Sequence, residues 1–412
     1  MNNSFLFIVG TLNIGGVETY IKRLTINLLK KNNNIKINIL LLTKSYDNEM
    51  FFELKNCVEI FFLSDFSFIP FKNSQLFDKL ANVIIPINFK KLSNLIGHID
   101  FIHTTSSETL LVANNLLKYN KNAKVISGIY HSKEYIWESN FYFRKVEKDI
   151  FVNFGEKNII SCNESSIDII NNHFKLNMNI NIIPIGIDKP VDILYNKGSN
   201  KIVSIGRLVK FKTYNEQIMK ILDSINTKYK LNLEYHIYGY GDNEIYLRNL
   251  SKNINSKVFF HGILNYSNFS NVLKDCLVFV GSGTSIIESS ALGIPSIIGI
   301  ESNNDGETYG FFSNLRGYSY NEDNLDIEKK TYYEILEILF TSLNMDELSI
   351  SHKNKANEFL IDNTSNMFVN LCKKSLISSY FSYNKIRYSL SYFTWLILNK
   401  LKLNNELKTK FD

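Results

Sequence analysis

The segment 281–285 and the carboxylate of Glu288 form the pattern with the clearest chemical meaning in this chain. The segment reads Gly-Ser-Gly-Thr-Ser. The apolar run at 276–280, which precedes the segment, predicts a strand, and residues 286–292, which follow it, predict a helix. A strand, a glycine turn and a helix start aim free backbone N–H groups and the helix dipole at one point, which favours a phosphate. A carboxylate one turn into the helix would repel that phosphate, so Glu288 needs another partner, and a ribose diol suits it. The pattern predicts a site for a nucleoside diphosphate. Its candidate residues are Gly283, Thr284, Ser285 and Glu288.

Two permanent cations follow a second glycine. Residues 201–205 predict a strand that ends at Gly206, and Arg207 and Lys212 lie in the loop beyond it. Two cations at the tip of a strand can clamp a pyrophosphate. Most Arg and Lys side chains are simply solvated, so two ordinary loop residues are the competing interpretation. The position of the pair ahead of Glu288, in the same half of the chain, favours a functional role.

Two more predicted strands run into glycine turns. Gly239 follows the strand at 233–238, and His261 and Gly262 follow the strand at 258–260. The residues after Gly239 do not complete a dinucleotide fingerprint, so a dinucleotide cofactor is not predicted. We expect these three residues to offer backbone groups to a ligand, and simple turns are the alternative.

Near the N-terminus, a glycine pair follows the first predicted strand, residues 5–9. Gly15 and Gly16 lie ahead of a predicted amphipathic helix at 17–31. They would let backbone amides approach a ligand across a cleft. The alternative is an ordinary helix N-terminus with Glu18 placed favourably in its first turn.

Two histidines lie where strands of the first half end. A lone histidine is more often structural than catalytic, and for His103 we favour the structural role. His131 follows the predicted strand at 125–130, where a cleft would lie, and we expect it to be functional.

Composition narrows the function classes. The chain has 412 residues, 45% of them hydrophobic, which is enough for two or three domains. Its net charge of +6 is too weak to indicate nucleic-acid binding but fits an anionic ligand or lipid surface. Four dispersed cysteines predict neither a metal site nor disulfides, and they fit a reducing cytoplasm. No signal peptide and no transmembrane run is predicted.

Strand-like runs alternate with helical patterns, and the rhythm restarts after a polar linker at 188–200. This alternation predicts an α/β protein of two Rossmann-like, doubly wound domains, whose ligand lies in the cleft between them. We expect an N-terminal domain at 1–187, a second domain with the nucleoside diphosphate site at 188–374 and a helical tail at 375–412. The tail is aromatic and basic, and two interpretations stay open: a helix packed back on the first domain, which we favour, or a helix lying on anionic membrane lipid.

Six motifs in this chain resemble, in kind and order, those of the GT-B glycosyltransferases, and more narrowly the retaining family 4 type. The resemblance covers the chain up to about residue 370. The motifs are Gly-Gly-Val-Glu at 15–18, Ile-Pro-Ile-Gly-Ile-Asp at 183–188, Gly206-Arg207 with Lys212, Tyr-Gly-Tyr-Gly at 238–241, Phe-His-Gly at 260–262, and 281–295 with Glu288.

The resemblance implies that the domain at 1–187 is on the acceptor side and that the domain at 188–374 binds the nucleotide sugar. It also implies roles for individual residues. Arg207 and Lys212 would neutralise the departing diphosphate without a metal, and Glu288 would hold the ribose. The amides of Thr284 and Ser285 would meet the phosphates. Gly16 would approach the diphosphate, and His131 would line the donor sugar.

One position departs from the family. The family often has a second Glu eight positions before the one at 288, where this chain has Val280. The missing carboxylate usually orients hydroxyl groups of the donor sugar, so the identity of that sugar stays open.

The sequence thus predicts a cytoplasmic glycosyltransferase that uses a UDP- or GDP-sugar and no cofactor or metal. The predicted acceptor is a hydroxyl of a growing, lipid-linked surface polysaccharide, such as an O-antigen or a capsule, and the anomeric configuration is retained. Two alternatives remain: a sugar-nucleotide epimerase of the same fold, and a non-catalytic nucleotide-sugar-binding subunit, which Val280 favours.

Overall fold

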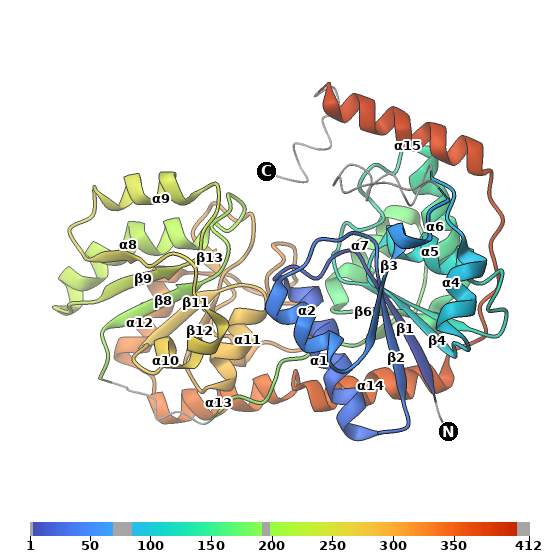
Figure 1. Ribbon diagram of the computed structural model, residues 1–412. Helices are drawn as coiled ribbons and strands as arrows, with labels where there is room; N and C mark the ends of the chain where they lie inside the picture. Colours follow the sequence, from blue (N-terminus) through green and yellow to red (C-terminus); the bar gives the residue numbers. More distant parts are fainter. Residues whose placement is uncertain (1–2, 69–84, 192–197, 402–412) are drawn as a thin grey trace. The chain divides into compact units, whose positions relative to one another are not determined.

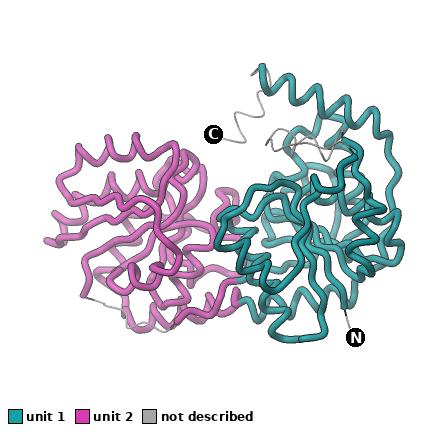
Figure 2. Tube along the Cα trace, in the orientation of Figure 1, with its two compact units in different colours: residues 1–186, 361–411 teal, residues 187–360, 412 magenta. Residues whose placement is uncertain are grey.

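The chain folds into two compact units. The computed structural model describes residues 3–68, 85–191 and 198–401. Unit 1 comprises residues 1–186 and 361–411, and unit 2 comprises residues 187–360 (Figure 2). Each unit has its own sheet and its own hydrophobic core.

Unit 1 is built on a parallel sheet of seven strands in the order β3-β2-β1-β4-β5-β6-β7 (Figure 1). The order reverses between β1 and β4, which makes the sheet doubly wound. The central strand β1 is buried on both faces, as its unbroken apolar sequence predicts. The strands are β1 (Ser4–Val9), β2 (Lys36–Leu41), β3 (Glu59–Phe62), β4 (Phe101–Thr104), β5 (Lys124–Ile129), β6 (Ile159–Ser161) and β7 (Asn181–Ile182).

Helices cover both faces of this sheet. Phe5, Phe7 and Val9 of β1 join a core with α1, α2 and α14, whereas Leu6 and Ile8 join a core with α4, α5, α6 and α7. The period of two along the strand therefore divides its side chains between the two layers. The helices of unit 1 are α1 (Gly16–Lys31), α2 (Asn48–Lys55), α4 (Phe89–Ile96), α5 (Ser107–Leu116), α6 (Tyr142–Phe154), α7 (Glu164–Phe174), α14 (Ile361–Lys374) and α15 (Lys385–Lys400), with 3₁₀ turns η1 (Leu63–Phe66) and η2 (Glu156–Asn158).

Unit 2 repeats the plan with five parallel strands in the order β10-β9-β8-β11-β12. Along β11, Val278 and Val280 face the core beside α8 and α12, and Phe279 faces the core beside α10 and α11. The elements are β8 (Lys201–Ile205), α8 (Tyr214–Tyr229), β9 (Glu234–Tyr238), α9 (Glu244–Ser251), β10 (Val258–Phe260), η3 (Tyr266–Asn268), α10 (Phe269–Leu273), β11 (Val278–Gly281), α11 (Thr284–Ala291), β12 (Ser296–Ile298), η4 (Phe312–Asn314), α12 (Tyr332–Thr341), α13 (Met345–Asn357) and the small antiparallel pair β13 (Glu307–Thr308) and β14 (Lys330–Thr331). The predicted class, α/β with two Rossmann-like doubly wound halves, is confirmed.

The described C-terminal residues belong to unit 1 from Ile361 onward, whereas the sequence predicts a second domain that runs to residue 374. The reason is the packing of α14: Phe368 lies edge-on to Phe7, with ring centroids 6.2 Å apart, and Leu371 and Cys372 lie in the same core. The apolar stripe of α14 is visible in the sequence, but nothing in it states which of two sheets it covers.

The tail helix α15 packs against α6 of unit 1. Tyr388 and Tyr392 are buried in that contact. The opposite face of α15 is exposed. The helix can therefore pack on unit 1 and still present a face to a membrane. Among the helices of the described residues, none combines the length and the apolar character needed to cross a bilayer.

Candidate functional site

The turn after β11 has the geometry of an anion site. Gly283 is the N-cap of α11 and has φ of +67°, a conformation that side-chain-bearing residues rarely adopt. The first turn of α11 has no acidic residue, and Ser285 Oγ donates a hydrogen bond of 3.1 Å to the carbonyl of Ser282. The backbone N–H groups of Thr284 and Ser285 therefore begin a helix whose positive dipole end carries no compensating carboxylate in that turn.

Glu288 lies one turn further along α11. It is half-buried, and its Oε1 accepts a hydrogen bond of 3.1 Å from the hydroxyl of Tyr266, in η3. Tyr266 was not predicted as a site residue, because only the fold brings η3 beside α11. The contact holds the carboxylate in place ahead of any ligand.

Lys212 extends over the carboxyl end of β8. Its Nζ would lie 3.5 Å from a Cβ built on Gly206, an ordinary van der Waals distance, so the ammonium group lies beside this glycine. Because β8 pairs directly with β11, Gly206 and the α11 turn follow adjacent strands at the same edge of the sheet. The exposed Arg207 and the half-buried Lys212 thus belong to the same edge as the anion turn.

The glycines after β9 and β10 allow three loops to approach closely. Gly239 has φ of +141°, and a Cβ there would collide with the carbonyl oxygen of Gly206. Gly206 N–H donates to the carbonyl of Tyr238 at 3.0 Å, and Gly239 N–H donates to the carbonyl of Gly262 at 2.7 Å. These backbone hydrogen bonds therefore fix the loop that follows β8, which carries Arg207 and Lys212, against the loops that follow β9 and β10.

His261 uses its backbone N–H within the sheet, donating to the carbonyl of Ile237 at 2.9 Å. Its ring stacks on Tyr238 at 4.2 Å, and its Nε2 lies 3.0 Å from Nδ1 of His236. Burial, and next the positive charge of Lys201, lowers the pKa of His261. The ring is thus kept neutral near neutral pH.

A carboxylate lies near the α11 turn despite the valine at position 280. Val280 is fully buried in the core and points away from solvent. Glu301, in the loop after β12, accepts a hydrogen bond of 2.8 Å from Ser282 Oγ, directly ahead of Gly283. No motif marked Glu301 in the sequence. The signal that could have found it is its place after a third predicted strand, since the ends of parallel strands meet at one edge.

In unit 1, the start of α1 is already covered by its own carboxylate. Gly15 is the N-cap of α1, and a Cβ there would collide with Glu18. Glu18 Oε1 also accepts a hydrogen bond of 3.1 Å from Thr11 Oγ1. Nothing lies within 4 Å of a Cβ built on Gly16, so its backbone is open to approach.

His103 and His131, two of the histidines of unit 1, have different surroundings. His103 is fully buried between the carbonyl of Ile126 (2.9 Å) and the hydroxyl of Tyr130 (2.8 Å), and burial lowers its pKa to about 4. These contacts are those of a structural residue. His131 is exposed after β5, accepts from the backbone N–H of Lys133 at 3.1 Å and lies on the ring of Trp137 at 4.3 Å. Because β4 separates β1 from β5, His131 and Gly16 follow strands that are not neighbours.

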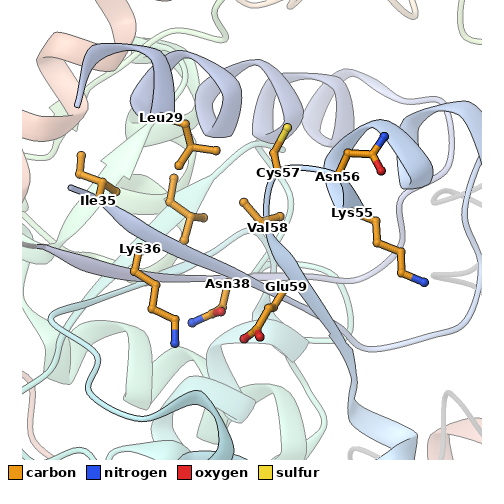
Figure 3. Close-up of a pocket in the computed structure, with 10 residues that line it drawn as sticks. Leu29, Ile35, Lys36, Asn38, Lys55, Asn56, Cys57, Val58 and Glu59 are labelled. Atoms are coloured by element: carbon orange, nitrogen blue, oxygen red, sulfur yellow. The ribbon is translucent and has the colours of Figure 1, made fainter. Parts of the chain in front are cut away.

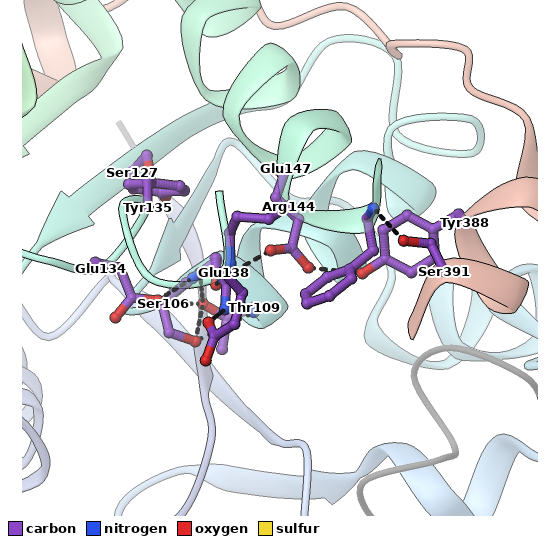
Figure 4. Close-up of polar contacts among 12 residues, drawn as sticks. Ser106, Thr109, Ser127, Glu134, Tyr135, Glu138, Arg144, Glu147, Tyr388 and Ser391 are labelled. Carbon is purple, nitrogen blue, oxygen red and sulfur yellow. Dashed lines mark hydrogen bonds and ion pairs between the residues drawn. The ribbon is translucent and has the colours of Figure 1, made fainter. Parts of the chain in front are cut away.

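A buried charge cluster, defined by Arg144, Glu138 and Glu147, lies in unit 1 beside Ser107 at the start of α5 (Figure 4). Arg144 donates to Glu147 Oε2 at 2.8 Å, to Glu138 Oε2 at 3.0 Å and to Ser107 Oγ. Glu138 has φ of +57°, an unfavourable conformation for its residue type that the ion pair helps to hold. Burial raises the pKa of Glu147 to about 7, although Arg144 opposes the shift. No motif in the sequence marks this cluster.

An open pocket of about 440 Å³ lies elsewhere on unit 1 (Figure 3). Lys36, Asn38 and Glu59 line it at the amino ends of β2 and β3. The candidate residues of unit 1 follow the carboxyl ends of strands, so this pocket belongs to the opposite edge. Within the described ranges, no group of three or more His, Cys, Asp or Glu side chains could hold a metal ion.

Comparisons with known proteins agree with this arrangement. Residues 188–305 match the family model of glycosyl transferases group 1. Among solved structures, a glycosyltransferase of Rickettsia africae is 15% identical with a TM-score of 0.64, covering 92% of this chain and 100% of its own. The lipopolysaccharide outer core galactosyltransferase WaaB is 12% identical with a TM-score of 0.58, covering 90% of this chain and 100% of its own. HepE of Anabaena in complex with UDP and glucose is 12% identical with a TM-score of 0.59, covering 89% of this chain and 98% of its own.

None of the curated protein sequences matches the chain. Because the sequence identities to the solved structures are low, those structures show the fold alone. The match at 188–305 indicates the family. That match includes the cation loop and the α11 turn with Glu288. The protein is a glycosyltransferase with the GT-B fold, and its residues 188–305 match the model of the group 1 glycosyltransferase family.

Proposed function

We propose that this enzyme moves a sugar from a UDP- or GDP-sugar to a hydroxyl of a growing surface polysaccharide that is linked to lipid, with retention as in family 4. The observation that carries the proposal is the edge of the sheet in unit 2, where Lys212, the start of α11 and Glu288 follow neighbouring strands. A diphosphate needs cations and amides, and a ribose needs a carboxylate beside them. All three are present at this edge.

In the proposed reaction, charge develops on the diphosphate as the bond to the anomeric carbon breaks. Lys212 and Arg207 neutralise that charge, and the amides of Thr284 and Ser285 donate to the phosphate oxygens. Glu288 accepts from the ribose hydroxyls. Because Tyr266 holds Glu288 and the α11 helix fixes its first amides before the donor binds, these groups need little reorganisation during the reaction. The chemistry assigned to them requires no metal.

From unit 1 we propose two further contributions. Gly16, with open space at its Cα, brings backbone amides to the diphosphate. His131, exposed after β5, lines the donor sugar. Gly15, Gly206, Gly239, His261, Gly262 and Gly283 are proposed to shape the loops around the donor rather than to touch the reacting atoms.

The acceptor and the location are proposals drawn from likeness. HepE holds UDP and glucose, and WaaB is a galactosyltransferase of the lipopolysaccharide outer core. Both support a nucleotide-sugar donor and a surface-glycan acceptor for this chain. We place the reaction in the cytoplasm, where nucleotide sugars are made. Radiolabelled transfer from a panel of UDP- and GDP-sugars to a membrane lipid extract tests the proposal, and no transfer by folded protein would contradict it.

Two alternatives make different predictions. An epimerase would change the sugar with no acceptor present, and a binding subunit would hold the nucleotide without turnover even when acceptor is added. The group 1 match at 188–305 favours transfer over both.

Replacing Glu288 with alanine is expected to weaken nucleotide binding about ten- to a hundredfold, the loss that follows removal of a charge-assisted hydrogen bond. Calorimetry with UDP, GDP, ADP and CMP measures it and identifies the base. Glu337→Ala is the matched control, because Glu337 pairs with Lys228 on the outside of α12 in the same unit. If the Glu288→Ala variant bound the nucleotide as tightly as the native protein does, Glu288 would not be a residue of the nucleotide site.

Glu301 is proposed to supply the carboxylate that Val280 cannot. Its hydrogen bond to Ser282 aims it at the turn where the donor sugar would lie. Glu301→Gln is expected to lower kcat/KM for the nucleotide sugar about ten- to a hundredfold while leaving UDP or GDP binding within twofold, since only the sugar loses a contact. Steady-state kinetics and calorimetry separate the two effects. A loss of nucleotide affinity of the same size would mean that Glu301 acts on the whole site instead.

A further inference from the structure

The tail helix α15 is fixed on unit 1 by one of its faces. The ring of Tyr392 lies edge-on to that of Phe143, with centroids 5.1 Å apart, and Trp395 lies 5.7 Å from the same ring. The hydroxyl of Tyr388 donates to Glu147 Oε1 at 2.6 Å, and the backbone N–H of Phe143 donates to Ser391 Oγ at 3.3 Å (Figure 4). These contacts tie α15 to the buried charge cluster, so the helix has a defined outward face.

That outward face is apolar. Five large hydrophobic side chains are spaced four, three, four and four residues apart, which places them in one stripe along the helix. Their spacing puts them on the side opposite the buried tyrosines. They are Ile386 (76% exposed), Leu390 (64%), Phe393 (48%), Ile397 (45%) and Leu401 (60%). We call these five residues the α15 stripe. Since α15 already packs on unit 1 through its other face, a contiguous apolar stripe on its exposed face marks a surface that contacts something else.

The charge around the stripe is of one sign. Lys385, Arg387 and Lys400 are exposed cations on α15, and the sequence from residue 363 to residue 405 has no Asp or Glu. The six basic residues of that segment equal the formal net charge of the whole chain, +6, so the remainder of the chain is electrically balanced. Three of these six cations, Lys385, Arg387 and Lys400, lie on α15 itself, the helix that carries the exposed apolar stripe.

The occupant of this surface must match both properties. A second copy of the chain related by a two-fold axis would bring cations against cations, which costs free energy. An anionic lipid surface meets the stripe with its acyl boundary and the cations with its phosphates. The geometry points to α15 as a helix that lies in the plane of an anionic lipid surface and holds unit 1 against it, with the α15 stripe inserted.

The fixed position of α15 has a physical consequence for this binding. A free peptide must fold as it binds, and this helix is already folded and anchored through Tyr388 and Tyr392. The protein therefore does not lose the conformational entropy that a free peptide loses when it folds on a membrane. For this reason a short apolar stripe with three described cations suffices for reversible attachment of unit 1 to the lipid surface. The attachment requires neither donor nor acceptor, so its test is independent of sugar transfer.

The test is co-sedimentation of the full-length protein with vesicles of phosphatidylcholine alone and of phosphatidylcholine with 30 mol% phosphatidylglycerol, chosen as roughly the anionic content that attracts basic helices. We expect binding to the anionic vesicles and at least about tenfold less to the neutral ones. The double variant Leu390→Glu/Ile397→Glu is expected to lose at least about tenfold of the affinity for anionic vesicles. Lys385→Gln/Lys400→Gln is expected to weaken binding at low salt and to reduce its salt dependence.

The control is Leu95→Glu, which puts one glutamate at a similarly exposed leucine of α4 in the same unit and is matched to Leu390→Glu alone. It should bind as the native protein does, and all variants should keep the native unfolding temperature because each position is exposed. Absence of native binding to anionic vesicles overturns the proposal. So does equal loss in Leu95→Glu and the double variant, or a dimer in solution that the double variant dissolves while vesicle binding stays native.

Discussion

Replacing Lys212 with alanine is expected to lower kcat about a hundred- to a thousandfold, the usual loss when a preorganised group that stabilises developing charge is removed. Its ammonium lies beside Gly206 at the end of β8, next to the strand that leads into α11. The negative charge on the diphosphate grows as the sugar departs, so the interaction is stronger in the transition state than in the ground state. Initial-rate kinetics at saturating donor, with turnover detected as released nucleotide, measure the effect.

The kinetic pattern separates this role from simple binding. A transition-state role lowers kcat and kcat/KM together, whereas a uniform binding role raises KM at unchanged kcat. Lys220→Ala is the matched control, since Lys220 is exposed on α8 and pairs with Glu216. Native kcat in the Lys212→Ala variant would show that the lysine has no role in the reaction, and Arg207 and Lys210 would then be the remaining cations of the loop.

The parts of the fold that sequence could predict are those in which local pattern and tertiary structure agree. The apolar run of β1 must be buried on both faces, and Gly239 and Gly283 adopt conformations that favour glycine. The α/β class, the two doubly wound halves and the turn before Glu288 follow from such constraints. Each depends on residues close together in the chain.

What the sequence could not show depends on contacts between distant residues. Glu301 reaches the α11 turn only because β12 pairs with β11, and Tyr266 reaches Glu288 only because η3 lies beside α11. The assignment of α14 to unit 1 depends on which aromatic side chains fit around Phe368. Periodicity identifies a buried face, but it does not identify the partner of that face.

The buried charge cluster is the clearest case of this kind, because three ionisable residues between positions 138 and 147 predict nothing by themselves. Arg144→Met is expected to lower the free energy of unfolding by about 3–5 kcal/mol, since it leaves the carboxylates of Glu138 and Glu147 buried without their counter-ion. The midpoint of thermal unfolding should fall by about 6–20 °C. Arg248→Met, which breaks an exposed pair with Glu244 four residues away, should cost less than about 0.5 kcal/mol.

The pH dependence of the Arg144→Met variant tests the electrostatic cause. Burial already raises the pKa of Glu147 to about 7 in the native protein, and loss of Arg144, which opposes that shift, must raise it further. A carboxyl group with a folded pKa above its unfolded value binds more protons when folded, so its contribution to stability is present at low pH and is lost as the pH rises through the folded pKa. The stability gap between variant and native protein should therefore narrow from pH 8 to pH 5, as seen by thermal unfolding at each pH. A gap that stays constant would assign the loss to the missing packing of the arginine, because packing does not titrate.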